Sequence, residues 1–265
     1  SAFSASQVLG IPASLYLANS WNWRLPFWAM GVLAVLVWGL IFFGLRPLNG
    51  HLERQNSVNP LRHLVRTVLN PRYINGLSVI LLLATGGYML MPFASTFSIY
   101  NLKISAHHLP LVYMVTGVVM MLSAPWIGRL SDSWGKLPVF IMGSVLAMSM
   151  VLYYTRLGPI SIFFLTGIQI VLFFGLNCRM IAAQALLSAV PENRDRGAYM
   201  ALQGALQHLS GGVASWLAGR IIQRSATGEL LRYPLLGLVV VCAMIFTVIQ
   251  MIRLHFNVIR RDHES

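Results

Sequence analysis

The sequence predicts an all-α integral membrane protein. Of its 265 residues, 57% are hydrophobic and only 10% are charged, whereas a soluble domain carries roughly 25% charged residues. The mean hydropathy of +0.68 indicates that much of the apolar surface faces lipid rather than water. The sequence lacks the alternation of polar and apolar residues, in segments of about ten, that is typical of membrane barrels. The spans are therefore expected to be helices.

Uncharged runs long enough to cross the hydrocarbon core, about 20 residues at 1.5 Å each, predict eight membrane-spanning helices. Only Arg179 and His208 interrupt these runs. The runs lie at residues 1–18, 25–45, 73–102, 109–128, 137–155, 159–185, 198–219 and 234–252.

The connections between these spans differ in basic charge from one membrane face to the other. One face carries twelve Lys and Arg residues: Arg46, Arg54, Arg62, Arg66, Arg72, Arg129, Lys136, Arg194, Arg196, Arg253, Arg260 and Arg261. The opposite face carries six: Arg24, Lys103, Arg156, Arg220, Arg224 and Arg232. The positive-inside rule predicts that the first face, with both chain ends, is cytoplasmic in a cell (inner or plasma) membrane. The net charge of +12 is then explained by topology, and no nucleic-acid partner is expected.

An internal repeat predicts a larger architecture. Residues 5–18 align with residues 205–218 at an offset of 200, with identical residues at Ala5, Gln7, Leu9, Leu17 and Ala18. The second copy lies six spans after the first, which predicts a two-half, twelve-helix fold of the kind that secondary transporters use. On this interpretation the chain begins at the fifth helix and four spans are expected upstream. The expected parts are the last two helices of the first half (1–45), a cytoplasmic linker (46–72), a six-helix second half (73–255) and a cytoplasmic tail (256–265).

The linker contains an amphipathic segment. Leu61, Leu64, Val65 and Val68 recur at helical spacing, with Arg62, His63 and Arg66 between them. Two interpretations remain open at this point: an interfacial helix against anionic lipid, or a solvated linker turn.

The most specific motif follows the fourth span. Residues 128–136 read Gly-Arg-Leu-Ser-Asp-Ser-Trp-Gly-Lys, and this resembles the cytoplasmic loop signature of the major facilitator superfamily, Gly-x-Leu-Ala-Asp-Arg-x-Gly-Arg-Lys. It lies between the spans expected to be helices eight and nine, where that family carries its second copy of the signature. Ser133 stands where the family has Arg, so a weaker charge network is expected. Gly128, Asp132, Gly135 and Lys136 are the candidate cytoplasmic gating loop.

The resemblance implies a role for Asp132. Its carboxylate is expected to accept hydrogen bonds from the positive N-terminal end of a neighbouring helix, here the helix that starts at Ser1, and so to clamp the two halves together. Small residues at helical spacing, Ala2, Ser6, Gly10, Ser14 and Ala18, predict close helix packing. Part of this segment also resembles the helix-five motif of exporters, which points to the sugar-efflux and drug-efflux branches. A similar set of small residues, Gly211, Ser215 and Gly219, recurs in the span at 198–219.

Polar residues at membrane depth are the candidate substrate-cavity residues: Tyr88, Gln169, Gln207 and His208. Unpaired polar groups are costly in hydrocarbon, so these side chains should face a watered cavity or a hydrogen-bonding partner. Each candidate also has a purely structural interpretation. The two glutamines could form interhelical hydrogen bonds instead of lining a cavity, and His208 could be a hydrogen-bonded core histidine rather than a proton carrier. Tyr88, beside Gly86 and Gly87, could simply take part in helix packing. Arg179 is expected to snorkel to the cytoplasmic interface. His51, His63, His107 and His108 are expected to face solvent.

No Asp or Glu lies inside any predicted span. The resemblance therefore implies that any proton-carrying acid belongs to the upstream helices. No phosphate-binding glycine loop or catalytic motif occurs, so neither an enzyme nor a cofactor or metal site is expected. The leading hypothesis is secondary active transport of a small solute by alternating access, as proton-coupled efflux by an antiporter; its partners would be the solute, the lipid bilayer and protons. The alternative is a non-transporting remnant or membrane interaction protein derived from a truncated transporter.

Overall fold

The structure of the chain is a computed structural model that describes residues 10–44, 60–192 and 195–264. Nearly all of this part is helical, as the long apolar runs predict. The helices are α2 (Ile11–Ser20), α3 (Leu25–Gly44), α4 (Pro60–Val68), α5 (Pro71–Tyr100), α6 (Leu109–Trp134), α7 (Lys136–Tyr154), α8 (Ile162–Leu187), α9 (Arg196–Ile221) and α10 (Tyr233–Glu264). A 3-10 turn, η3 (Ala106–His108), precedes α6. A two-stranded antiparallel hairpin, β1 (Gln223–Arg224) and β2 (Leu230–Leu231), joins α9 to α10.

Six of the eight expected spans are helices both long and apolar enough to cross a membrane in the described residues. These are Leu25–Gly44, Tyr73–Tyr100, Ala106–Trp134, Lys136–Tyr154, Ile162–Leu187 and Tyr233–Phe256. Helix α9 has the length, 26 residues, but contains more polar residues. Helix α2 has ten residues in the described part.

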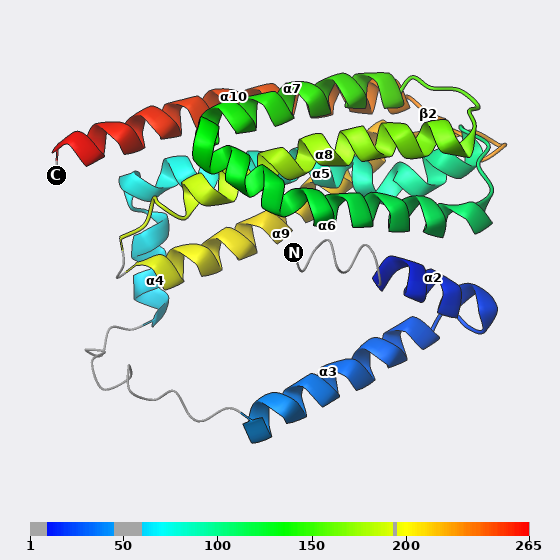
Figure 1. Ribbon diagram of the computed structural model, residues 1–265, viewed down its shortest axis with the longest axis horizontal. Coiled ribbons are helices and arrows are strands. Elements are labelled where there is room, and N and C mark those ends of the chain that lie inside the picture. Colours follow the sequence, from blue (N-terminus) through cyan, green and yellow to red (C-terminus); the bar gives the residue numbers. More distant parts are fainter. Residues whose placement is uncertain (1–9, 45–59, 193–194, 265) are drawn as a thin grey trace.

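Helices α5 to α10 run alongside one another as a bundle (Figure 1). The most extensive contacts join α7 to α8 and α5 to α9. Glycines bring the first pair close together: a Cβ atom on Gly143 of α7 would lie 2.7 Å from the carbonyl oxygen of Gly175 on α8. Small residues at such crossings let the two backbones approach, which is how helices associate in lipid.

The N-terminal helices are far less buried than this bundle. Helix α3 contacts α2, which in turn contacts α6, and no residue of α3 is buried. Its Trp28 and Phe43 are 74% and 87% exposed. Apolar surface of this extent marks contact with lipid or with other helices.

The end of α6 differs from the prediction. The apolar run suggested a span at 109–128 with a connection at 129–136, but α6 continues to Trp134 and only Gly135 separates it from α7. Gly135 has φ of 97°, a backbone conformation that favours glycine because other residues clash at Cβ. Charged residues end an apolar run without ending a helix, since their side chains reach water at the interface while the backbone hydrogen bonds continue.

Candidate functional site

Amide side chains connect α8 to α9 and to α6. Gln203 of α9 donates from Nε2 to Oε1 of Gln184 on α8, at 2.6 Å. Asn177 of α8 donates from Nδ2 to the carbonyl oxygen of Met120 on α6, at 3.2 Å. Neither contact was predicted. The amides could have been read from the sequence as polar groups inside apolar spans, but their partners lie on other helices and no local pattern identifies them.

Tyr88 lies at the crossing of α5 and α9. A Cβ atom on Gly211 would lie 2.9 Å from Cγ of the Tyr88 ring, so the ring packs directly against the glycine. Ser215, one turn later, donates its hydroxyl to the backbone carbonyl of Tyr88 at 3.1 Å. Two of the small residues predicted to form a packing face, Gly211 and Ser215, therefore do so. Helix α5 continues without a break through Gly86 and Gly87.

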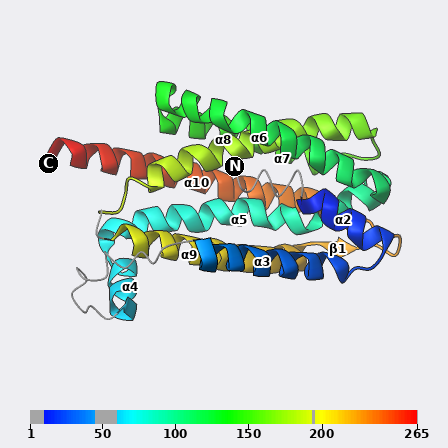
Figure 2. The same cartoon turned by 60° about the horizontal axis from the view of Figure 1, so that its bottom comes forward.

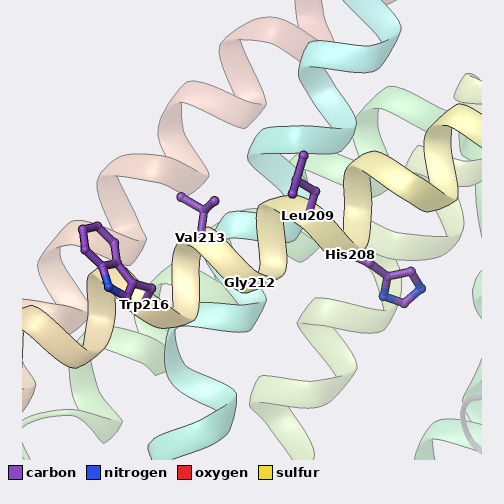
Figure 3. A pocket seen from close by; sticks show the side chains of 5 residues that line it. All are labelled: His208, Leu209, Gly212, Val213 and Trp216. Atoms are coloured by element: carbon purple, nitrogen blue, oxygen red, sulfur yellow. The ribbon is translucent and has the colours of Figure 1, made fainter.

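The opposite side of α9 is open. A shallow hollow of about 360 Å³ is lined by His208, Leu209, Gly212, Val213 and Trp216. Figure 3 shows Gly212 between the His208 and Trp216 side chains, which are two turns apart. Apart from the backbone of its own helix turn, no atom of the described residues lies within 4 Å of the position that a Cβ on Gly212 would occupy, so the missing side chain leaves space between the imidazole and indole rings.

The four candidate cavity residues fall into two groups. Gln207 is half-buried and His208 is exposed; both lie about one turn from Gly211, against which Tyr88 packs. Gln169 belongs to the buried face of α8 and is only 4% exposed. Tyr88 therefore lies within about one turn of Gln207 and His208 along α9, but its ring packs against Gly211, whereas His208 lines the open hollow.

The residues of the candidate gating loop lie at the junction of α6 and α7. Asp132 is exposed in the last turn of α6, Gly128 is half-buried one turn earlier, and Lys136 begins α7. The expected partner of Asp132, the helix start at Ser1, lies outside the described residues.

Arg179 does not snorkel, contrary to expectation. It is 2% exposed, and its guanidinium carbon lies 5.4 Å from the centroid of the Phe140 ring on α7, a distance at which a cation and a ring attract. Nε has no hydrogen-bond partner within the described residues. Counting residues along a helix gives depth but not direction, and Arg179 lies on the same face as Cys178 and Ala182, which α7 and α6 cover.

A second correction concerns His63, which was expected to face solvent. Its Nε2 lies 3.0 Å from Oδ1 of Asp195, and Tyr73 donates its hydroxyl to Oδ2 of the same carboxylate at 2.8 Å. These groups border a polar cavity of about 180 Å³ lined by His63, Arg66, Thr67, Asn70, Tyr73, Glu192 and Asp195. His107 and His108 are exposed, as expected, and His51 lies outside the described residues. No three His, Cys, Asp or Glu side chains in the described ranges could hold a metal ion together.

Comparison with known proteins agrees with the motif at residues 128–136. The sequence model of the Major Facilitator Superfamily matches residues 1–215 and again residues 76–260. The chain is 26% identical over 231 residues to a Bacillus subtilis (strain 168) protein named "Uncharacterized MFS-type transporter YceJ". That alignment covers 83% of this chain and 55% of the relative, so the chain spans about half the relative's length. The chain belongs to the Major Facilitator Superfamily, a family of multi-pass membrane transporters.

Proposed function

We propose that the protein carries out secondary active transport of a small solute by alternating access, as proton-coupled efflux, and that the open side of α9 lines the solute path. Family membership supports transport in general. The coupling to protons, the outward direction of transport and the path of the solute along α9 are our proposal. The cytoplasmic placement of the linker and of both chain ends in a cell membrane belongs to the same proposal and is supported by the basic residues counted above.

The observation that carries the proposal is an exposed histidine on the open side of a helix, in the middle of a span. His208 lies twelve residues after the first residue of α9, Arg196, or about 18 Å along the helix axis, which is near mid-membrane for a core about 30 Å thick. It is exposed and forms no hydrogen bond within the described part of the chain. A polar group in this position is costly against lipid and stable against water or a polar solute.

His208 is also the group that we propose to carry the proton. Imidazole changes charge within the physiological pH range, and the predicted spans contain no Asp or Glu. The half-buried Gln207 is adjacent in sequence and offers both an amide donor and a carbonyl acceptor. The imidazole of His208 would take up and release the proton, and both side chains would bind the hydroxyl or amine groups of a small solute.

The test is a flux measurement in proteoliposomes that contain a trapped pH-sensitive dye. The protein, produced from its natural gene, is challenged with sugars and with the cationic dye ethidium. We expect at least one of these solutes to move protons, and His208→Gln to abolish that movement. His107→Gln is the matched control, because His107 is an exposed histidine outside the long helices.

Two outcomes contradict the proposal. Solute-dependent proton movement that survives in His208→Gln removes His208 from the coupling step. An absence of movement with every solute, in protein that is folded and inserted, favours the non-transporting alternative.

A further inference from the structure

Helix α4 lies across the end of the bundle rather than along it. Figures 1 and 2 show it running transverse to α5 and α9 at the end where α9 begins, and it contacts both helices. If the bundle helices cross the membrane, a helix in this orientation lies in the plane of the membrane surface. Amphipathic helices in this position insert at the boundary between headgroups and acyl chains.

One side of α4 is attached to the bundle by polar contacts. The Asp195 carboxylate immediately precedes α9 and bonds through one oxygen to His63 of α4 and through the other to Tyr73 of α5. Thr67, one turn after His63 on the same side of α4, is 3% exposed, so this side is covered by the protein. These contacts determine which side of α4 faces the protein. The opposite side of α4 therefore faces away from the bundle.

The free side of α4 and of the turn after it is apolar. Val65, Val68 and Leu69 are 57%, 40% and 68% exposed, and their spacing places them on one helical face. Aliphatic side chains exposed together on water are unfavourable, at roughly 25 cal/mol per Å² of apolar surface. The same residues would be favourable in the acyl region of a bilayer.

The positive charge of this segment favours lipids with anionic headgroups. Residues 60–72 contain three arginines, Arg62, Arg66 and Arg72, and no acidic residue. Arg66 is exposed on α4, and Arg196 is exposed in the first turn of α9. Two carboxylates, Glu192 and Asp195, line the same polar cavity as Arg66, and Asp195 accepts bonds from His63 and Tyr73.

We infer that α4 is an anionic-phospholipid binding site: Val65, Val68 and Leu69 insert among acyl chains while Arg66 binds the headgroup phosphate. The contacts with Asp195 attach α4 to the end of the bundle, so α5 and α9 hold the site in place. The inference needs the chain to be inserted in a membrane but does not depend on transport. Of the two interpretations of this segment that the sequence left open, the inference adopts the interfacial helix against anionic lipid.

The test places an environment-sensitive nitrobenzoxadiazole label on Val65→Cys in a Cys242→Ser background. The remaining cysteine, Cys178, is buried. The chain is reconstituted into vesicles of phosphatidylcholine alone or mixed with phosphatidylglycerol. Quenching is then measured with aqueous iodide and with lipids that carry a nitroxide near the headgroup.

We expect rising phosphatidylglycerol to shield the label from iodide and expose it to the lipid nitroxide. Arg66→Gln should raise the phosphatidylglycerol fraction that gives half-maximal shielding by roughly fivefold, the effect of one basic residue at an anionic surface. Arg224→Gln is the matched control, because Arg224 is in β1 at the opposite end of the bundle (Figure 2). A second label at Leu69→Cys should respond like the first, which guards against a local effect of one substitution.

Three results overturn the inference. Equal access of iodide with and without phosphatidylglycerol indicates a solvated linker. Shielding from both quenchers indicates that protein covers the face. Equal shifts for Arg66→Gln and Arg224→Gln indicate general surface charge rather than a site on α4. Each of these results is independent of the flux measurement, so loss of the lipid site and loss of the transport proposal are distinguishable.

Discussion

Two adjacent glycines in α9 have opposite surroundings. Gly211 faces α5, and a Cβ atom there would collide with the Tyr88 ring at 2.9 Å. Gly212 faces the hollow beside His208, and among the described residues no atom beyond its own helix turn lies within 4 Å of its Cβ position. The comparison shows that one side of α9 is shaped for close helix packing, while the other side keeps space next to a polar group. Small residues therefore serve two purposes within one turn of the same helix.

The largest expected effect is on stability at this pair. Gly211→Leu should lower the free energy of unfolding by about 1–3 kcal/mol, because overpacking forces α5 and α9 apart. For a chain of this size that corresponds to a fall of several degrees, roughly 2–4 °C per kcal/mol, in the unfolding temperature. Gly212→Leu, its matched control, should leave the unfolding temperature nearly unchanged. Thermal unfolding in detergent measures both, and equal shifts would mean that the two faces of α9 do not differ as described.

A second matched pair extends the comparison to polar residues. Gln203 is 7% exposed and bonded to Gln184, whereas Gln207, one turn later, is half-buried. Gln203→Leu should cost about 0.6–1.7 kcal/mol of stability, the range for interhelical hydrogen bonds in membranes, while Gln207→Leu should cost less. The double variant with Gln184→Leu should recover part of the loss, because it leaves no unpaired amide. If Gln207→Leu lowers the free energy of unfolding more than Gln203→Leu does, the packed and open faces of α9 have been assigned the wrong way round.

The sequence predicted the helices well because about twenty consecutive apolar residues are hard to place anywhere but across a membrane. The span expected at 137–155 is observed as Lys136–Tyr154, and that at 25–45 as Leu25–Gly44. Prediction failed at α6, where the charge of Arg129 and Asp132 ended the apolar run but not the helix. Hydrophobicity reports contact with lipid, whereas helix length depends on backbone hydrogen bonds.

The candidate site was less predictable, for a different physical reason. The bond between His63 and Asp195 joins residues 132 positions apart, and the packing of Tyr88 on Gly211 depends on how two helices cross. Periodicity gives the face of a residue within its own helix but not the helix that covers it. For the same reason the exposure expected for Arg179 was wrong, although its position along α8 was counted correctly.

A smaller effect, on conformational balance rather than on stability, is expected from a substitution at the junction of α6 and α7. Asp132→Asn should not change the unfolding temperature, since Asp132 is exposed. If Asp132 clamps a helix N-terminus, as the sequence motif implies, the loss of its charge should shift the balance between inward-open and outward-open states. Thiol accessibility of Trp216→Cys on the open face of α9, in a Cys242→Ser background, would report this shift. If Trp216→Cys is labelled at the same rate with and without the Asp132→Asn substitution, Asp132 has no part in the clamp.

The central claim, that the open side of α9 faces a solute path, is tested most directly by water access at Gly212. Gly212→Cys in a Cys242→Ser background is exposed to a membrane-impermeant, water-soluble thiol reagent in intact cells and in inverted vesicles. We predict that the cysteine reacts, and that its rate from each side changes when a proton gradient is imposed, as alternating access requires. Reaction only with lipid-soluble maleimides, with no access from water on either side, would contradict the claim and show that this face of α9 is covered by lipid or by another helix.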